Sequence, residues 1–332
     1  MSSQTEQQPT GPPPETVEPA SVAGRTLARP ATGRSRLRKN VEVALFTAPA
    51  LLLYLCFVVV PMGMAAFYSV FNWNGLGPLN RFIGLDNYST ALHDPVFRGA
   101  VAHNVTIVVL SILVQLPVGL GLALLLNRKM RGRAFLRTVF FAPYVLSEVI
   151  TAVTWLLILQ PDGFMDAIFK AVGLGDLVQL WLADQHFVLY TLFVVITWKY
   201  VGFGIILFLA GLQAIPKELM EAAAIDGATP WKAIRYITIP LMGPTIRIWI
   251  FLSIIGSLQL FDLVWIMTLG GPANASSTMA TYVIDHGFKR SQFGYGSAVA
   301  MILFFISFVV ALLYQRFELR RDTEGAMTRI AG

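Results

Sequence analysis

Six long, mostly apolar stretches constrain what this chain can fold into more than any other feature. They cover residues 43–68, 101–126, 139–159, 187–209, 248–267 and 295–314, and their only charged side chains are Glu148, Lys199 and Asp262. A helix needs about 20 such residues to cross the hydrocarbon core of a bilayer. Unpaired backbone groups cannot face lipid, so each stretch must be helical or shielded by protein. The pattern predicts an all-α integral membrane protein with six transmembrane helices.

The composition argues against a soluble globular protein and against a secreted protein held together by disulfides. Only 13% of the residues are charged, against about 25% in a typical soluble domain. The single cysteine, Cys56, cannot form a disulfide within the chain, and we expect it to be a small buried apolar side chain. The four histidines do not group with carboxylates at metal-ligand spacing, so we expect no metal site.

The distribution of basic residues predicts an orientation. Of the 25 Lys and Arg residues, 19 lie before the first stretch, between the second and third, between the fourth and fifth, and after the sixth. Five lie in the remaining loops, and Lys199 lies within a stretch. The positive-inside rule therefore places both termini in the cytoplasm. Because the basic residues form short clusters between apolar stretches, we expect no nucleic-acid partner.

The same pattern divides the chain into four regions. Residues 1–40 include a segment rich in Pro, Ser, Thr, Glu and Gln, a composition that cannot bury a core, so we expect a disordered cytoplasmic tail. Residues 41–100 form the first transmembrane helix and an external loop. Residues 101–315 form a core of five transmembrane helices with a long cytoplasmic loop at about 211–243, and residues 316–332 form a second cytoplasmic tail.

The loop between the fourth and fifth stretches predicts a helix–turn–helix. Pro216 suits a first helical position, and Gly227 suits the left-handed residue just past a helix end. Thr229 followed by Pro230 is typical of the start of a second helix, which we expect Pro240 to end.

Residues in this loop resemble the cytoplasmic signature of permease subunits in binding-protein-dependent ABC importers. The signature is Glu-Ala-Ala, three residues, Gly, nine residues, Ile, one residue, Leu-Pro. It falls here on Glu221, Ala222, Ala223, Gly227, Ile237 and Pro240, with Asp226 before the glycine and Ile239 in place of the usual Leu. The resemblance implies the type I importer permease fold. It also implies that these residues couple the membrane helices to a separate ATPase.

Further segments resemble the carbohydrate branch of that family, the maltose and glycerol-phosphate type. They are residues 82–88 with 94–97 and Asn104, residues 208–216, residues 261–262 with 268–272, and residues 294–298. The resemblance implies a second, different permease subunit, two ATPase subunits, an extracytoplasmic solute-binding protein and a sugar substrate, in the plasma membrane of a bacterium. ATP would be used by the ATPase subunits. The chain itself lacks the Gly-Lys pair of a phosphate-binding loop, so we expect it to bind no cofactor.

The fourth and fifth stretches hold the side chains that we expect to line a substrate pathway. Sugar recognition needs hydrogen-bonding groups and flat apolar faces. The candidates are Lys199, Tyr200, Phe203, Ser253, Ser257, Gln259 and Asp262. Helix packing and interhelical hydrogen bonds are alternative roles for the aromatic and serine side chains. The charged residues Glu148, Lys199 and Asp262 face protein or water, either as a pathway or as mutual ion pairs.

Two other functions stay open at this point. An ion-coupled secondary transporter also has many membrane helices, although the few ionisable residues within the stretches disfavour a proton relay. A membrane-embedded enzyme would need a catalytic constellation, and the sequence contains no paired carboxylates, histidine cluster or activated nucleophile. We therefore expect no catalytic residue and no enzymatic activity in this chain.

Overall fold

The computed structural model describes residues 33–128 and 130–316 of the chain. The described residues fall into two units that divide between Val59 and Val60. The first contains helix α1 (Gly33–Tyr54) and a π-helical turn, η1 (Leu55–Val59). Most of the two predicted tails lies outside the described residues, but α1 begins within the segment that we expected to be disordered.

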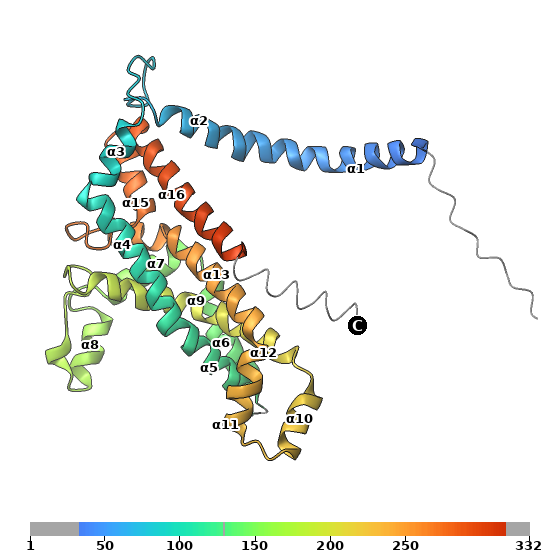
Figure 1. Ribbon diagram of the computed structural model, residues 1–332. Coiled ribbons are helices and arrows are strands. Elements are labelled where there is room, and N and C mark those ends of the chain that lie inside the picture. The colour runs from blue at the N-terminus through green and yellow to red at the C-terminus, as the bar shows by residue number, and fades with distance from the viewer. Residues whose placement is uncertain (1–32, 129, 317–332) are drawn as a thin grey trace, which may run out of the picture. The chain divides into compact units, whose positions relative to one another are not determined.

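The regular elements in the described part of the second unit are all helices and helical turns, joined by loops, and one isolated β-bridge pairs Phe71 with Phe82. Its long helices are α4 (Pro95–Leu110), α5 (Leu116–Asn127), α6 (Arg133–Val145), α7 (Glu148–Ile158), α9 (Val188–Gln213), α13 (Gly243–Leu258) and α16 (Phe293–Tyr314). Shorter helices are α2 (Val60–Tyr68), α3 (Asp86–His93), α8 (Phe164–Ala171), α10 (Lys217–Ile225), α11 (Pro230–Ala233), α12 (Ile239–Leu241), α14 (Asp262–Met267) and α15 (Met279–Ile284). Single turns are η2 (Ser111–Gln115), η3 (Gly175–Leu177), η4 (Ile234–Thr238) and η5 (Asp285–Lys289) (Figure 1).

Four described helices are long and apolar enough to cross a membrane. They are Val41–Tyr68, Pro95–Asn127, Val188–Gln213 and Phe293–Tyr314. Two bent pairs, Arg133–Val145 with Glu148–Ile158 and Pro230–Leu241 with Gly243–Leu258, bring the number to six if each is one span. The expected all-α class with membrane-spanning helices is therefore confirmed.

Two of the expected spans are not single helices. The third is broken between Val145 and Glu148 and bends by 99°. The break has a local cause, because Ser147 adopts an extended conformation and its side chain accepts a hydrogen bond from the backbone N–H of Ile150, which starts a new helix. The expected fifth span, 248–267, is also wrong as one helix: α13 ends at Leu258 and α14 starts at Asp262.

The expected burial of Cys56 is wrong as well. Its side chain is exposed in η1. The neighbouring apolar side chains are exposed too, including Phe46 and Phe57. A helix that leaves apolar side chains uncovered is suited to lipid contact, where a cysteine behaves as one more apolar group.

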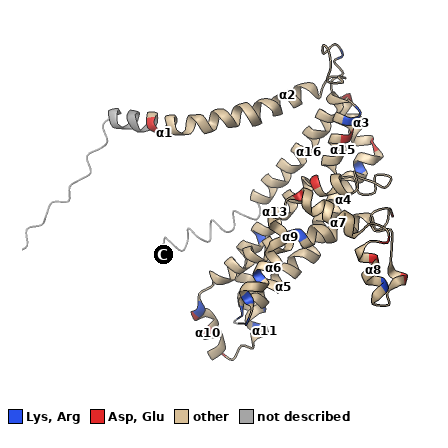
Figure 2. Ribbon diagram, turned by 180° about the vertical axis from the view of Figure 1, so that it is seen from behind, with Lys and Arg blue, Asp and Glu red and all other residues tan. Residues whose placement is uncertain are grey.

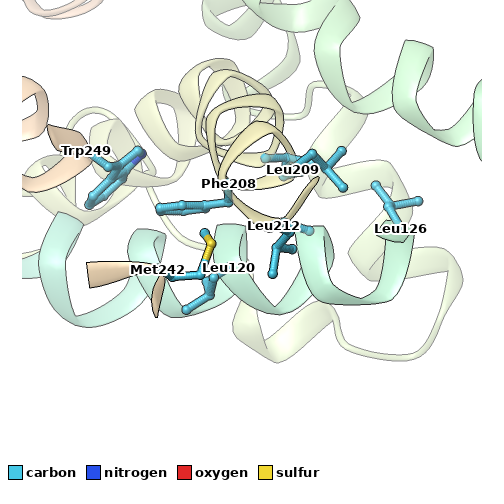
Figure 3. Packing of buried hydrophobic residues seen from close by; sticks show 9 residues of the cluster. Leu120, Leu126, Phe208, Leu209, Leu212, Met242 and Trp249 are labelled. Atoms are coloured by element: carbon cyan, nitrogen blue, oxygen red, sulfur yellow. The ribbon is translucent and has the colours of Figure 1, made fainter. Parts of the chain in front are cut away.

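Helix α9 lies at the centre of the second unit. One side of α9 packs in a cluster with α5 and α13 that includes Leu120, Phe208 and Trp249 (Figure 3). Another side packs in a second cluster with α7 and α14, which includes Leu192 and Leu263. Apolar residues occur all around α9 rather than along one face. Such a pattern is typical of a helix that is buried on several sides.

Gly202 lets α9 approach α6 closely. A methyl group at this position would collide with the backbone carbonyl of Phe140. We predict that Gly202→Ala destabilises the protein by about 1–3 kcal/mol, the usual cost of forcing an extra methylene into a packed core. The measurement is thermal unfolding of the purified chain in detergent, followed by tryptophan fluorescence.

Gly121→Ala is the matched control, because Gly121 is also helical and has nothing within 4 Å of an added methyl group. Alanine is the better helix former, so this variant is expected to be neutral or slightly stabilised. Equal melting temperatures for the two variants would contradict the close approach of α6 and α9.

Candidate functional site

A cavity of about 290 Å³ lies among the spans of the second unit. Its walls come from α4 with η2, from α6, from α9 and from α13. Four of the residues expected on a substrate pathway line it: Tyr200, Phe203, Ser253 and Ser257. We call it the pathway cavity; its other main lining residues are Ile107, Ser111, Gln115, Tyr144, Ile196, Trp249, Leu252, Gly256 and Leu260.

Three aromatic rings form one wall of the pathway cavity. Tyr144 stacks on Phe203, with ring centroids 5.2 Å apart and planes 24° apart, and meets Tyr200 edge-on at 6.1 Å. Tyr144 was not among the residues expected from the sequence. It lies in the last turn of α6, directly before the break in the third span. The wall offers flat apolar faces of the kind that pack against a ring.

Ser111 and Gln115 supply polar groups that the sequence analysis also missed. They lie one turn apart in η2, and both are buried. Gln115 is only 5% exposed, and its Nε2 has no hydrogen-bond partner among the described residues. A buried amide left unpaired is costly, which makes Gln115 the strongest candidate for a group that binds a ligand. The sequence did contain a signal for them, because two polar residues four positions apart in an otherwise apolar stretch lie on the same face of a helix.

Lys199 lies beside the pathway cavity without lining it. Its side chain is 2% exposed, and Nζ donates a 2.6 Å hydrogen bond to the backbone carbonyl of Leu146, in the break between α6 and α7. Nζ also lies 3.6 Å from Oε1 of Glu148, and that same oxygen accepts a 2.6 Å hydrogen bond from the Tyr200 hydroxyl. Of the two roles expected for these charged residues, Glu148 and Lys199 form the mutual ion pair. Lys199 also contacts the backbone at the break, so the pair supports the bend between α6 and α7.

The two remaining pathway candidates, Gln259 and Asp262, are exposed at the break between α13 and α14. Neither lines the pathway cavity. The break turns the chain after Leu258, so these side chains do not continue the helix face that carries Ser253 and Ser257.

The loop between α9 and α13 forms the expected helix–turn–helix, here called the signature hairpin (residues 217–241). α10 begins directly after Pro216 and ends before Gly227, whose φ of +75° is left-handed. The backbone N–H groups of Gly227 and Ala228 donate to the carbonyls of Ala224 and Ala223, which is a Schellman ending.

The second helix starts as predicted but does not end as predicted. The Thr229 side chain accepts a hydrogen bond from the backbone N–H of Lys232. Pro240 lies inside α12, so the expectation that it ends the helix is wrong. The chain turns at Met242 instead, between the helical segments Pro230–Leu241 and Gly243–Leu258, which make a bend of 63°.

The signature residues divide between packing and exposure. Ala223 is buried and Ile237 is half-buried, whereas Glu221, Ala222, Asp226 and Pro240 are exposed. In the part of the chain that the structure describes, Glu221 makes no ion pair with Lys217 or any other residue. Ala223 therefore has a packing role within the hairpin, and Glu221 is available to a partner.

Three large apolar side chains of the hairpin are exposed and were not expected from the sequence. Ile225 is 86% exposed, Trp231 is 71% exposed and Tyr236 is 74% exposed. The hairpin lies at the end of the second unit where Lys and Arg gather around α5, α6, α10 and α11 (Figure 2). An apolar group beside a basic rim has the character of a protein-binding surface.

Comparison with known proteins identifies the family. Residues 115–323 match the family described as binding-protein-dependent transport system inner membrane component. The chain is 33% identical to the multiple sugar-binding transport system permease protein MsmF of Streptococcus mutans, covering 81% of this chain and 92% of that protein. It is 32% identical to the lactose transport system permease protein LacF of Rhizobium radiobacter, covering 88% of this chain and 98% of that protein.

The fold is also that of a solved importer. One chain of a bacterial ABC transporter involved in the import of the acidic polysaccharide alginate superimposes with a TM-score of 0.75, at 24% identity, over 86% of this chain and 99% of that chain. Fold, signature hairpin and sequence matches agree, and the chain belongs to the binding-protein-dependent transport system inner membrane components, as an ABC transporter permease.

Proposed function

We propose that this permease carries a carbohydrate through the pathway cavity. The observation that carries the proposal is the composition of that cavity, which sets the stacked rings of Tyr144 and Phe203 beside the unpaired amide of Gln115. Flat faces suit the C–H surfaces of a sugar ring, and amide and hydroxyl groups suit its hydroxyls. The sugar permeases among its relatives support the same substrate class.

The signature hairpin is proposed to bind a separate ATPase. Among the described residues Glu221 is exposed and makes no ion pair, and Ile225, Trp231 and Tyr236 of the same hairpin expose apolar surface. A protein partner would bury these apolar groups and give Glu221 a charge-assisted contact. The proposed assembly has this chain, a second permease subunit, two ATPase subunits and an extracytoplasmic solute-binding protein, in a bacterial plasma membrane with both termini cytoplasmic. ATP is used by the ATPase subunits.

The mechanism proposed is alternating access. Nucleotide at the ATPase and loaded binding protein at the other face each favour one of two helix packings, which is a shift between populations. A sugar held by few hydrogen bonds leaves the cavity readily after the switch. The ion-coupled alternative has no support from the relatives, and Lys199 and Glu148 pair with each other beside the cavity rather than forming a chain of proton-binding groups.

We predict that Gly227→Leu uncouples the transporter. An added methyl group at Gly227 would meet no neighbouring atom within 4 Å. The effect of the substitution therefore comes from the left-handed backbone conformation, which costs leucine about 1–2 kcal/mol. The turn of the signature hairpin would then change. We expect less sugar-stimulated ATP hydrolysis in the assembled complex, and less ATPase co-purified with the tagged chain and identified by mass spectrometry.

Gly173→Leu is the control for this prediction. Gly173 has a φ of +79° and open space, and lies outside the hairpin in the loop after α8. Gly173→Leu therefore has the same unfavourable backbone conformation as Gly227→Leu, at a position outside the proposed ATPase interface. Unchanged ATPase activity and recovery in Gly227→Leu would argue strongly against the proposed role of the hairpin.

We predict that Gln115→Leu lowers sugar uptake about tenfold. Loss of one hydrogen bond to the sugar costs about 1 kcal/mol or slightly more, and about 1.4 kcal/mol is a factor of ten. Removal of an unpaired buried amide should not destabilise the fold. The measurement is uptake of the labelled sugar whose import is lost when the chain is deleted.

Gln259→Leu makes the same chemical change at an exposed position outside the cavity. Uptake by this variant is expected to stay within about twofold of wild type, as for a surface substitution. If Gln259→Leu abolished uptake while Gln115→Leu did not, the sugar would follow a different path from the one proposed.

A further inference from the structure

A second, larger cavity is lined by residues of α3 and the loop before it, of η5, and of the start of α16. Figure 1 shows α3 and the start of α16 at the end of the second unit away from the signature hairpin. Its volume is about 530 Å³, within the range of small-molecule sites. Two segments far apart in the sequence, 72–94 and 286–295, build its walls. We call it the polar cavity.

Backbone and side-chain contacts hold the two walls together. The N–H of Gly294 donates a 2.9 Å hydrogen bond to the carbonyl of Trp73, and the Tyr282 hydroxyl donates to Oδ2 of Asp94 at 3.0 Å. A side chain at Gly294 would collide with the backbone carbonyl of Phe71, so the approach of the segments depends on that glycine. The polar cavity is thus a built feature of the fold and already has its shape without a ligand.

Four of the eleven residues that line the polar cavity carry carboxamide groups. Asn72, Asn74, Asn87 and Gln292 all face it. Asn87 is held in place because its Nδ2 donates to the carbonyls of Ser69 and Phe71, at 2.8 and 3.0 Å. Both Nδ2 protons of Asn87 are therefore used within the protein, and its Oδ1 remains to accept from a sugar hydroxyl. The carboxamides of Asn72 and Gln292 can both donate and accept, as each hydroxyl of a sugar does.

Aromatic faces stand beside these amides. Trp73 lines the cavity, and its indole N–H donates to the carbonyl of Gly77 at 3.1 Å, which fixes the ring. Tyr295 and His286 also line it, with ring centroids 5.6 Å apart. Rigid rings beside amides are the same combination as in the pathway cavity, in a more polar setting.

The charges around the polar cavity are compensated within the protein. Arg290 lies 2.8 Å from Oδ2 of Asp285. Asp94 accepts from the N–H groups of Val96 and Phe97 and from the Tyr282 hydroxyl, which outweigh burial and keep the pKa of its carboxyl below the usual value. Burial, with Arg290 nearby, lowers the pKa of His286 and favours its neutral form. Among the described residues that line the polar cavity, Arg290 is the one Lys or Arg, and its ion pair with Asp285 leaves no unpaired cation there to favour an anionic ligand.

We infer that the polar cavity is a second saccharide site, selective for a neutral sugar, which holds the substrate before it reaches the pathway cavity. The inference rests on the proposed function, because it takes the carbohydrate as the transported substrate. It adds a separate binding site with its own residues, on the face opposite the signature hairpin.

Cysteine labelling tests the inference on the full chain. Cys56 is the one native cysteine and is replaced in the variant Cys56→Ser. Into this background go Gln292→Cys, on the cavity wall, and Asn80→Cys, an exposed control outside the cavity in the loop that also carries Trp73. A membrane-impermeant maleimide is added to right-side-out vesicles of cells that make the whole transporter. The probe ligand is the sugar whose uptake is lost when the chain is deleted.

We expect that sugar slows labelling of Gln292→Cys about tenfold when its concentration reaches about ten times the half-protecting value, because only the empty site reacts. Labelling of Asn80→Cys should not change. Thr90→Cys, also on the wall, is the second probe if Gln292→Cys does not assemble.

Three results would overturn the inference. The first is no protection of either wall position by a sugar that the cells demonstrably import, and the second is failure of the wall cysteines to react from outside. The third is protection by sugar-free solute-binding protein alone, which would make the cavity a protein-docking site. If cells that lack the chain still import every sugar tested, the proposed function is contradicted. That result is distinct from the three results above, which concern the polar cavity alone.

Discussion

The hydrogen bond from the Lys199 ammonium to the Leu146 carbonyl supports the most unusual feature of this fold, a sharp break inside a membrane-spanning segment. Such a break removes helical partners from backbone carbonyls, and an unsatisfied group away from water costs several kcal/mol. Lys199 supplies the donor at 2.6 Å, and Glu148 offsets its charge. Tyr144, in the last turn of α6 before this break, contacts Tyr200 and Phe203 and completes the aromatic wall of the pathway cavity.

Local signals in the sequence predicted the ends of several helices well. Gly227 has the left-handed backbone expected of it, and Thr229 caps the next helix. The break in the third span also had a signal, since Ser147 followed by Glu148 is a helix start of the same kind. Hydropathy alone obscured it, because the apolar stretch runs across the break without interruption.

The cavities depended on information that one sequence does not contain. Tyr200 and Phe203 are three residues apart and share a helix face, so they were found together, whereas Lys199 is one position away and points toward the break. Gln115 belongs to another helix, and only the packing of α4 and η2 near α9 and α13 brings it to the same space. The polar cavity joins segments about 200 residues apart, a pairing that no local spacing could predict.

The bend at Met242 connects the signature hairpin directly to α13, which forms a wall of the pathway cavity. α13 runs from Gly243 without interruption to Leu258 and carries Ser253 on the cavity wall. At a rise of about 1.5 Å per residue, Ser253 lies about 15 Å along α13 from its first residue, Gly243. A change of about 10° in the bend would therefore move that serine by about 3 Å, comparable to the length of a hydrogen bond. The stiffness of α13 thus sets how far a given change of the bend angle displaces the wall of the pathway cavity.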